Sequence, residues 1–202
     1  MRSIAQTLIL MLVVASPAWA HDPSCSVVYS NTVTNQGVPV VVNDGDVVLD
    51  DVHASVGQSV LCAVDVRGRS FGPGVLSLYV YKGSSADDPP STLLAGPIDI
   101  VNPPVTSQSQ TLHYELPPTI ADQDLWIGVG WTGAGGAWVG SQRTTASIGT
   151  SHDLWWWHNA AGESGFNDQG PAYIASTYLV VYANVPTPTQ ASTWGALKAT
   201  YR

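Results

Sequence analysis

The chain has 202 residues with only 11% charged side chains and a formal net charge of −8. Because an acidic surface repels phosphate groups, nucleic acid and anionic membrane surfaces are poor partners for it. The length suits one domain that buries roughly 70% of its unfolded surface.

The first 20 residues have the features of a secretory signal peptide. Arg2 supplies the positive start, residues 8–15 are apolar, and Ala18-Trp19-Ala20 is a small-x-small cleavage site. The apolar run is shorter than the roughly 20 residues that span a bilayer; the alternative is a buried first helix. We therefore expect a secreted, extracellular or cell-surface protein that begins at His21 and has no membrane span. Its 6 basic and 15 acidic residues give a net charge of 6 − 15 = −9.

The two cysteines, Cys25 and Cys62, are expected to form a disulfide, because an exported chain oxidises an even number of thiols. The bridge closes a loop of 62 − 25 = 37 residues. The chain-entropy model assigns such a loop about 4 kcal/mol of stabilisation. Alternatively, Cys62 is a small buried hydrophobe.

Segments of alternating polar and apolar residues, separated by Gly, Pro and Asp turns, predict β-strands along the whole domain. The Asp-Gly pair at 44–45 predicts a tight hairpin. Pro39 places its segment at an edge or in a loop, Gly96-Pro97 kinks a strand, and Pro117-Pro118 ends one. The other predicted strands are 26–30, 47–49, 57–68, 76–81, 93–101, 112–116, 124–133, 137–141, 153–157 and 172–184.

Residues 124–133 are the clearest central strand. Ile127, Val129 and Trp131 alternate with two glycines, Gly128 and Gly130, which leave one face of the strand bare. A backbone or a large ring can approach such a face closely. We expect Trp126 and Trp138, which flank the segment, to fill the gap.

In residues 57–68, Val60, Cys62, Val64 and Val66 are expected to share one face. Together these patterns predict an all-β, antiparallel, jelly-roll-like β-sandwich of about nine or ten strands over residues 21–184. Residues 185–192 form a Pro/Thr linker. Residues 193–202 form a tail that serves either as a sorting or docking tag or as a segment lying on its own domain.

Three segments resemble secreted bacterial β-sandwich proteins of the choice-of-anchor type, which often carry PEP-CTERM or other sorting tails. They are Val28-Tyr29-Ser30-Asn31-Thr32, residues 45–49 and residues 149–155. The resemblance covers residues 26–184 and implies a β-sandwich of undefined biochemical activity with no catalytic residues to carry over. This chain departs from the pattern because it lacks a C-terminal membrane helix and its basic cluster.

An aromatic group around residue 156 is the strongest candidate binding site. Indole faces stack on sugar C–H faces, and nearby Asp and Asn side chains bind hydroxyl groups. The period of a strand puts Trp155 and Trp157 on one face and Trp156 on the other. The competing interpretation is that these rings fill the core, and exposure of the rings separates the two. The predicted ligand-binding residues are Asp153, Trp155, Trp157, His158 and Asn159.

We expect no metal and no cofactor. His152 and His158 are six residues apart, which matches no familiar zinc spacing, and His21, His53 and His113 are scattered. The acidic residues at 44, 46, 50 and 51 offer oxygen ligands for calcium but lack the EF-hand order, so turn formation and solvated charge explain them better.

Catalytic motifs are also missing from the sequence. It has no Gly-x-Ser-x-Gly elbow and no phosphate-binding loop. Glu115 and Glu163 are its only glutamates. The leading hypothesis is a non-catalytic binding or structural module whose partner is an extracellular glycan or a surface protein. The alternatives are a carbohydrate-binding module that uses the tryptophans and a glycan-directed hydrolase with paired carboxylates.

Overall fold

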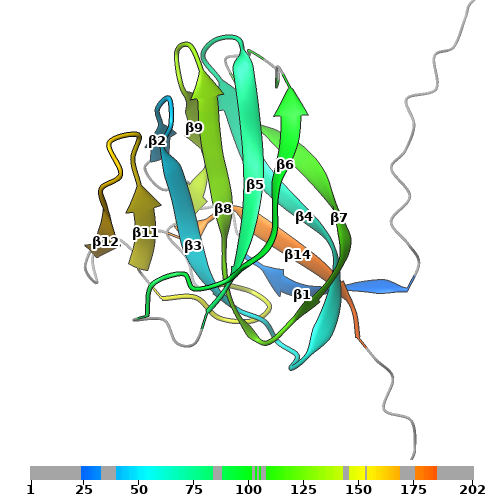
Figure 1. Ribbon diagram of the computed structural model, residues 1–202. Coiled ribbons are helices and arrows are strands. Elements are labelled where there is room, and N and C mark those ends of the chain that lie inside the picture. Colours follow the sequence, from blue (N-terminus) through cyan, green and yellow to red (C-terminus); the bar gives the residue numbers. More distant parts are fainter. Residues whose placement is uncertain are drawn as a thin grey trace, which may run out of the picture.

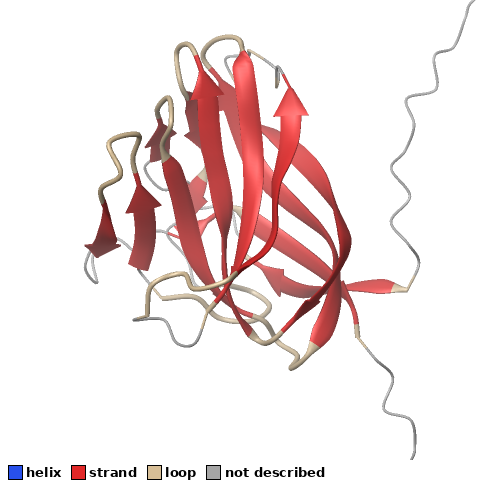
Figure 2. Ribbon diagram, viewed as in Figure 1, coloured by secondary structure: helices blue, strands red, loops and turns tan. Residues whose placement is uncertain are grey.

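The computed structural model describes residues 24–32, 40–83, 88–101, 103, 105, 108–142, 146–152, 154–168 and 176–185. The predicted signal peptide, the linker beyond Val185 and the tail at 193–202 lie outside these residues. The described part consists of strands and loops and contains no helix (Figure 2). It therefore holds no helix long and apolar enough to cross a membrane.

Two antiparallel six-stranded sheets pack face to face, which confirms the predicted β-sandwich (Figure 1). We name them after their central strands. The β4 sheet contains β1 (Cys25–Ser30), β14 (Leu179–Asn184), β4 (Ser59–Ser70), β9 (Ala137–Val139), β2 (Val40–Val42) and β7 (Gln110–Ala121). The β8 sheet runs β12 (Ser164–Asp168), β11 (Leu154–His158), β3 (Val47–His53), β8 (Asp124–Gly133), β5 (Gly74–Lys82), β6 (Leu93–Val101). A small third sheet pairs β10 (Ser141–Gln142) with β13 (Ser176–Thr177).

The core lies between the two sheets and follows the predicted alternation closely in the central strands. Leu76, Leu78 and Val80 of β5 are fully buried, and so is Ile127 of β8. Each buried aliphatic side chain contributes about 1.5–3 kcal/mol by leaving water. The inner face of a strand is thus fixed by period-two patterning, and a one-residue slip would expose it.

The bare face of β8 is closed by neighbouring strands. A Cβ atom on Gly128 would lie 2.0 Å from the Val48 carbonyl oxygen, so only glycine fits. At Gly130 the space is filled by Val47 Cγ2 and the Tyr79 ring, 2.9 and 3.0 Å from the position of a Cβ atom.

The prediction that Trp138 helps to fill that face is wrong. Trp126 lies on the same outer face but beneath the loop after β5, and its Nε1 donates to the Asp88 carbonyl oxygen at 3.0 Å. Trp138 belongs to β9, on the other sheet. Sequence neighbours of a glycine are poor guides here, because the groups that approach it come from adjacent strands.

The disulfide between Cys25 and Cys62 is present and joins β1 to β4, as predicted. The predicted face of Cys62 is wrong. A β-bulge shifts the register between Leu61 and Ala63, so Leu61, Val64 and Val66 face the core while Cys62 turns outward. A bulge inserts one residue into the alternation and so reverses it downstream.

Three local predictions differ from the structure. β7 continues through Pro117-Pro118 to Ala121, because it pairs only with β4 and its other edge needs no amide donors. The Asp-Gly turn joins β2 to β3, which belong to different sheets, so it is not a hairpin. Between the predicted strands 153–157 and 172–184, where no strand is predicted, lies β12, which pairs with β11 and places Phe166 opposite Trp156.

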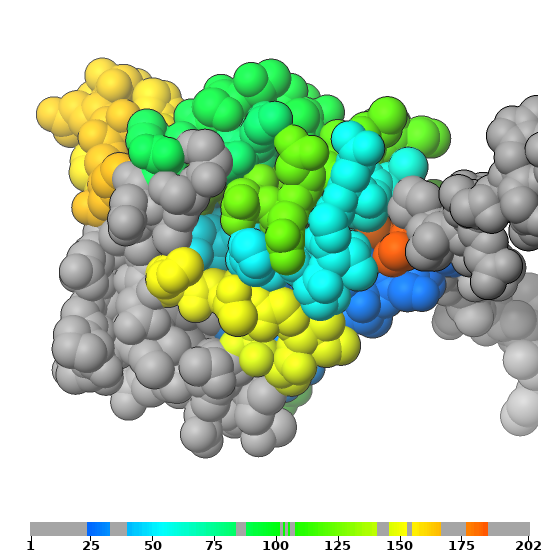
Figure 3. All heavy atoms as spheres, turned by 90° about the horizontal axis from the view of Figure 1, so that it is seen from below, coloured from blue at the N-terminus to red at the C-terminus, as the bar shows by residue number. Residues whose placement is uncertain are grey.

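Residues 146–152 cross one end of the sandwich and connect its two sheets. Ile148 bridges to Ser30 of β1, and Thr150 bridges to His53 of β3. Figure 3 shows this segment in yellow along the end of the molecule, against β1 in blue and the cyan residues that follow β3. The crossing carries His152 to the outer face of the β8 sheet.

Candidate functional site

The predicted tryptophan residues form a wall of a pocket at the edge of the sandwich. The pocket has a volume of about 360 Å³ and lies where β2 of one sheet approaches β3 and β11 of the other. We call it the tryptophan pocket. Its lining includes Val40, Asp46, Val48, Trp155 and Trp157, with His158 and Asn159 at the end of β11.

The pairing of β11 with β3 separates its aromatic side chains onto two faces. Trp155 stands opposite Asp50, and Trp157 opposite Val48, which packs against the core. Trp156 and His158 face the opposite side, where their rings are nearly parallel at 6° with centroids 6.0 Å apart. The structure therefore brings Trp155 and Trp157 together at the pocket, as the alternation predicts.

Trp155 is 7% exposed, while Trp157 is half-buried. The two rings do not form an exposed planar pair, nor do they belong to the main core cluster. The Trp155 Nε1 atom is buried and has no hydrogen-bond partner among the described residues. An unsatisfied buried donor costs about 1–3 kcal/mol, so this N–H is a group that gains by meeting an acceptor.

Asp46 adds a carboxylate to the pocket. Its Oδ2 accepts hydrogen bonds from the backbone and side-chain amides of Asn43, at 3.2 and 2.9 Å. Its Oδ1 has no partner among the described residues. The residues that line the pocket thus combine two indole rings with a buried N–H donor and a carboxylate oxygen, neither of which has a partner among the described residues.

The other predicted ligand residues contribute less. The Asn159 amide is committed to its own turn, because its Oδ1 accepts from the backbone N–H groups of Ala161 and Glu163 and its Nδ2 donates to Glu163 Oε2. The His158 ring lies on the outer face beside Trp156. Asp153 lies outside the described residues.

Beside Trp155, on the same inner face, lies the fully buried carboxyl group of Asp50. Its Oδ2 accepts the Thr177 backbone N–H at 2.6 Å, and its Oδ1 has no partner among the described residues. Burial raises the pKa of Asp50 well above its ordinary value, and the neighbouring Asp51 raises it further. This edge of the sheet therefore concentrates unsatisfied polar atoms.

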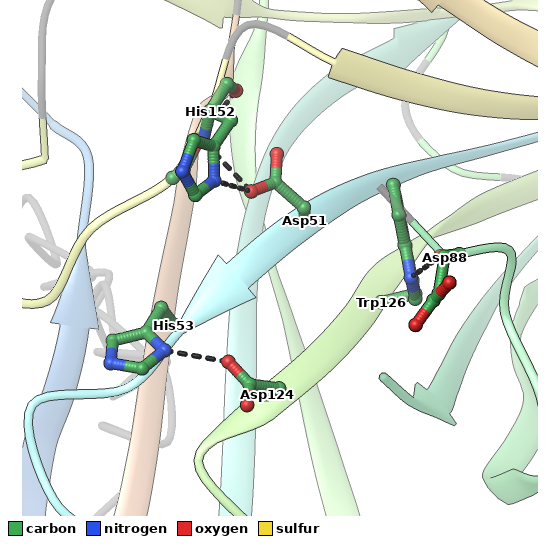
Figure 4. Close-up of polar contacts among 7 residues, drawn as sticks. Asp51, His53, Asp88, Asp124, Trp126 and His152 are labelled. Carbon is green, nitrogen blue, oxygen red and sulfur yellow. Dashed lines mark hydrogen bonds and ion pairs between the residues drawn. The ribbon is translucent and has the colours of Figure 1, made fainter. Parts of the chain in front are cut away.

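A second group of polar residues, which the sequence analysis did not predict, lies on the outer face of the β8 sheet. His152 donates its backbone N–H to Asp51 Oδ2 at 2.8 Å, and its Nδ1 lies 3.0 Å from the same oxygen (Figure 4). His53 Nδ1 lies 2.6 Å from Asp124 Oδ1. Each histidine is 71 or 101 residues from its partner, and only the strand register joins them.

Both pairs line one cavity of about 30 Å³. Burial raises the pKa of Asp51, and its hydrogen bonds to His152 lower it in part. Within the described residues, no group of three or more His, Cys, Asp or Glu side chains is placed to hold a metal. A cavity of this size holds one or two water molecules and excludes a sugar ring.

The acidic residues considered for calcium do not converge. Asp44 Oδ1 accepts the Gly133 backbone N–H at 2.9 Å, and Asp46 lies in the tryptophan pocket. Asp50 and Asp51 are buried on opposite faces of β3, so the expectation that they carry solvated charge is wrong. The turn-forming role predicted for Asp44 and Asp46 fits the structure.

The comparisons with known proteins give no relative from which a role can be transferred. No known protein family matches the chain, and neither a curated protein nor a solved structure matches it.

Proposed function

We propose that the protein is an exported, non-catalytic binding module and that its tryptophan pocket binds a saccharide. The observation that carries the proposal is that one pocket brings together the unpaired Trp155 N–H, the Asp46 carboxylate and the half-buried ring of Trp157. A saccharide offers both a C–H face for an indole ring and hydroxyl groups that donate and accept hydrogen bonds.

The dimensions support a small ligand. About 360 Å³ lies at the lower end of the usual volume of ligand pockets, which suits one or two sugar units. The lining is mainly aromatic and aliphatic with few polar groups, as is typical of such sites. The proposal of a binding or structural module without a saccharide ligand remains the alternative if no glycan binds.

A glycan-directed hydrolase has less support. Asp51 and Asp124 face one cavity, but each carboxylate is held by a histidine and the space between them is about 30 Å³. Glu163 is engaged by Asn159 in the turn after β11. Paired-carboxylate hydrolysis requires a sugar between two free carboxyl groups, about 5–10 Å apart.

The proposal is tested by screening the mature protein on a glycan array and measuring the best ligand by calorimetric titration. We expect Trp157→Ala to weaken binding at least about tenfold, as for a central aromatic anchor. Trp156→Ala is the matched control. It removes a half-buried indole from the adjacent position, on the other face of the strand, and should leave the affinity within about twofold of the wild type.

Binding to no glycan, or equal losses in the two variants, would reject the saccharide site. Export is tested separately by N-terminal sequencing of protein recovered from the culture medium. A start at His21 is expected. The Cys25–Cys62 disulfide supports this part of the proposal, because such bridges persist in oxidising compartments.

A further inference from the structure

A surface on the other sheet combines stacked arginines with exposed aromatic rings. On the outer face of the β4 sheet, the Arg69 guanidinium carbon lies 4.8 Å from the Trp138 ring centroid and 5.2 Å from that of Phe71. The Arg67 guanidinium carbon lies 5.6 Å from the Tyr178 ring centroid. We call this surface the arginine face.

The register shows that the arginine face is continuous. Arg69 stands directly opposite Trp138, and Trp138 directly opposite Val41 on the edge strand β2. Arg67 precedes Arg69 by two residues on the same side of β4, so the two are about 7 Å apart along the strand. Phe71 is 45% and Val41 52% exposed, so a ligand can reach the surface.

We propose that the arginine face binds an acidic polysaccharide, with Arg67 and Arg69 holding uronate carboxylates and the aromatic rings contacting the sugars. Charge is the first argument. The chain has 15 acidic and 7 basic residues. Arg67, Arg69 and Lys82 are the basic residues among those described, and two of these three lie here. Among the described residues, this face is where two positive charges lie close together.

The carboxylate nearest to Arg67 along β4 does not form an ion pair with it. Asp65 precedes Arg67 by two residues on the same face, but His113 Nδ1 lies 2.6 Å from its Oδ1 and the Tyr182 hydroxyl donates to its Oδ2 at 2.9 Å. No ion pair between Arg67 and a carboxylate occurs among the described residues. Lys82 differs, because its Nζ lies 2.8 Å from Asp122 Oδ2.

Stacking of Arg67 on the Tyr178 ring is compatible with carboxylate binding. A ring covers the face of a guanidinium group, whereas a carboxylate binds in its plane through two parallel N–H donors. Because the rings restrict the side-chain rotamers, less entropy is lost when the ligand binds. A lysine at the same position keeps the charge but loses the planar pair of donors.

The position on the sheet favours a sugar polymer over an acidic peptide. An extended peptide gains affinity by pairing its backbone with a sheet edge, whereas the backbone of Arg67 is already paired on both sides, with Thr111 and Tyr178. Beyond His113, the same face continues into a groove of about 520 Å³ that reaches Glu115 and the Cys25–Cys62 disulfide. A groove of this volume can hold a few sugar units.

The test is affinity electrophoresis of the intact protein in gels that contain polygalacturonate. Fully methyl-esterified polygalacturonate is the matched ligand, because it has the same rings without the charges. We expect the wild type to be retarded by the first and not by the second. Arg67→Gln should weaken the binding about tenfold, as for the loss of one charge-assisted contact, and Arg69→Lys at least about threefold.

Lys82→Gln is the control variant, because it removes the same charge from the other sheet and should change the affinity by less than about twofold. Unfolding midpoints of all variants establish that they are folded, and Trp157→Ala should bind polygalacturonate like the wild type. No retardation of the wild type, equal binding of the ester or of polyglutamate, or equal losses in Lys82→Gln and Arg67→Gln would overturn the proposal. None of these results bears on the tryptophan pocket.

Discussion

Buried tryptophans occupy two contrasting regions, the central strand β8 and strand β11, which lies next to the edge strand β12. In β8, the Nε1 of Trp126 donates to the Asp88 carbonyl oxygen and that of Trp131 to the Gly133 carbonyl oxygen, each at 3.0 Å. In β11, Trp155 is also buried, but its Nε1 has no partner among the described residues. Burial alone therefore does not separate structural from ligand-binding tryptophans.

The difference teaches that hydrogen-bond satisfaction is the better criterion. A structural indole rarely leaves its N–H unpaired, because the buried donor costs free energy with no return. Unpaired atoms accumulate beside Trp155, on Asp50 and Asp51 of the neighbouring strand. In the central strand β8 the tryptophan N–H groups are hydrogen-bonded, whereas β3 and β11 hold buried polar atoms that have no partner among the described residues.

The largest expected effect is on the central region. Trp131→Ala removes a side chain that is 1% exposed and packed in the core, and should lower the free energy of unfolding by about 3–5 kcal/mol. Urea denaturation measures the change. Trp138→Ala, which removes a half-buried ring from the outer face of the β4 sheet, is the control and should cost clearly less. Equal losses would show that the two positions are not distinguished by packing.

Two glycine substitutions compare how much space β8 and the neighbourhood of β11 leave for a Cβ atom. Gly128→Ala places a Cβ atom 2.0 Å from the Val48 carbonyl oxygen and should destabilise the protein by about 1–3 kcal/mol or more. Gly165→Ala, next to β11, meets the Trp157 ring at an ordinary 3.5 Å and should change stability by less than about 0.5 kcal/mol. Denaturation midpoints that shift equally would contradict the tight closure of β8.

The fold class followed from local chemistry. Alternation in β5 and β8, with turn residues between the strands, is enough to predict a sandwich, because one face of each strand must be buried. The sequence does not reveal the bulge at Cys62, since an inserted residue has no compositional signal. Nor does it reveal that Pro117-Pro118 lies on an edge strand, where a proline costs little.

The candidate site was predictable only in part. The spacing of Trp155 and Trp157 places both on one face, and the structure has them lining one pocket. The wall opposite, with Asp46 and Val40, comes from residues more than a hundred positions away. The pairing of His53 with Asp124 likewise depends on the register of β3 against β8, which no local pattern encodes.

The pH dependence of stability tests the buried carboxyl group of Asp50, which lies beside Trp155. Because the folded-state pKa of Asp50 is raised, the native protein binds its proton more tightly than the unfolded chain. The stability contributed by Asp50 is therefore greatest below the ordinary aspartate pKa of 3.8 and falls as the pH rises towards the folded-state pKa, by about 1.4 kcal/mol per pH unit for one proton.

Asp50→Asn should flatten this slope and raise the free energy of unfolding at neutral pH, because the amide stays neutral and its oxygen still accepts the Thr177 N–H. Urea unfolding at a series of pH values measures both quantities. A variant that is less stable at every pH, with the slope unchanged, would show that the Asp50 carboxyl group is well accommodated when charged.

The smallest change in stability is expected at Trp155 itself. Trp155→Phe removes a donor that has no partner while keeping an aromatic ring, so the lost packing and the relieved desolvation oppose each other, and the net change should stay within about 1 kcal/mol. The same substitution at Trp131 breaks the hydrogen bond to Gly133 and should cost more. Saccharide affinity should fall in Trp155→Phe and stay close to the wild type in Trp131→Phe, because Trp155 lines the pocket and its N–H has no partner among the described residues. If Trp155→Phe binds saccharide as tightly as the wild type, the unpaired N–H serves no ligand, and the contrast between the two strands reduces to packing alone.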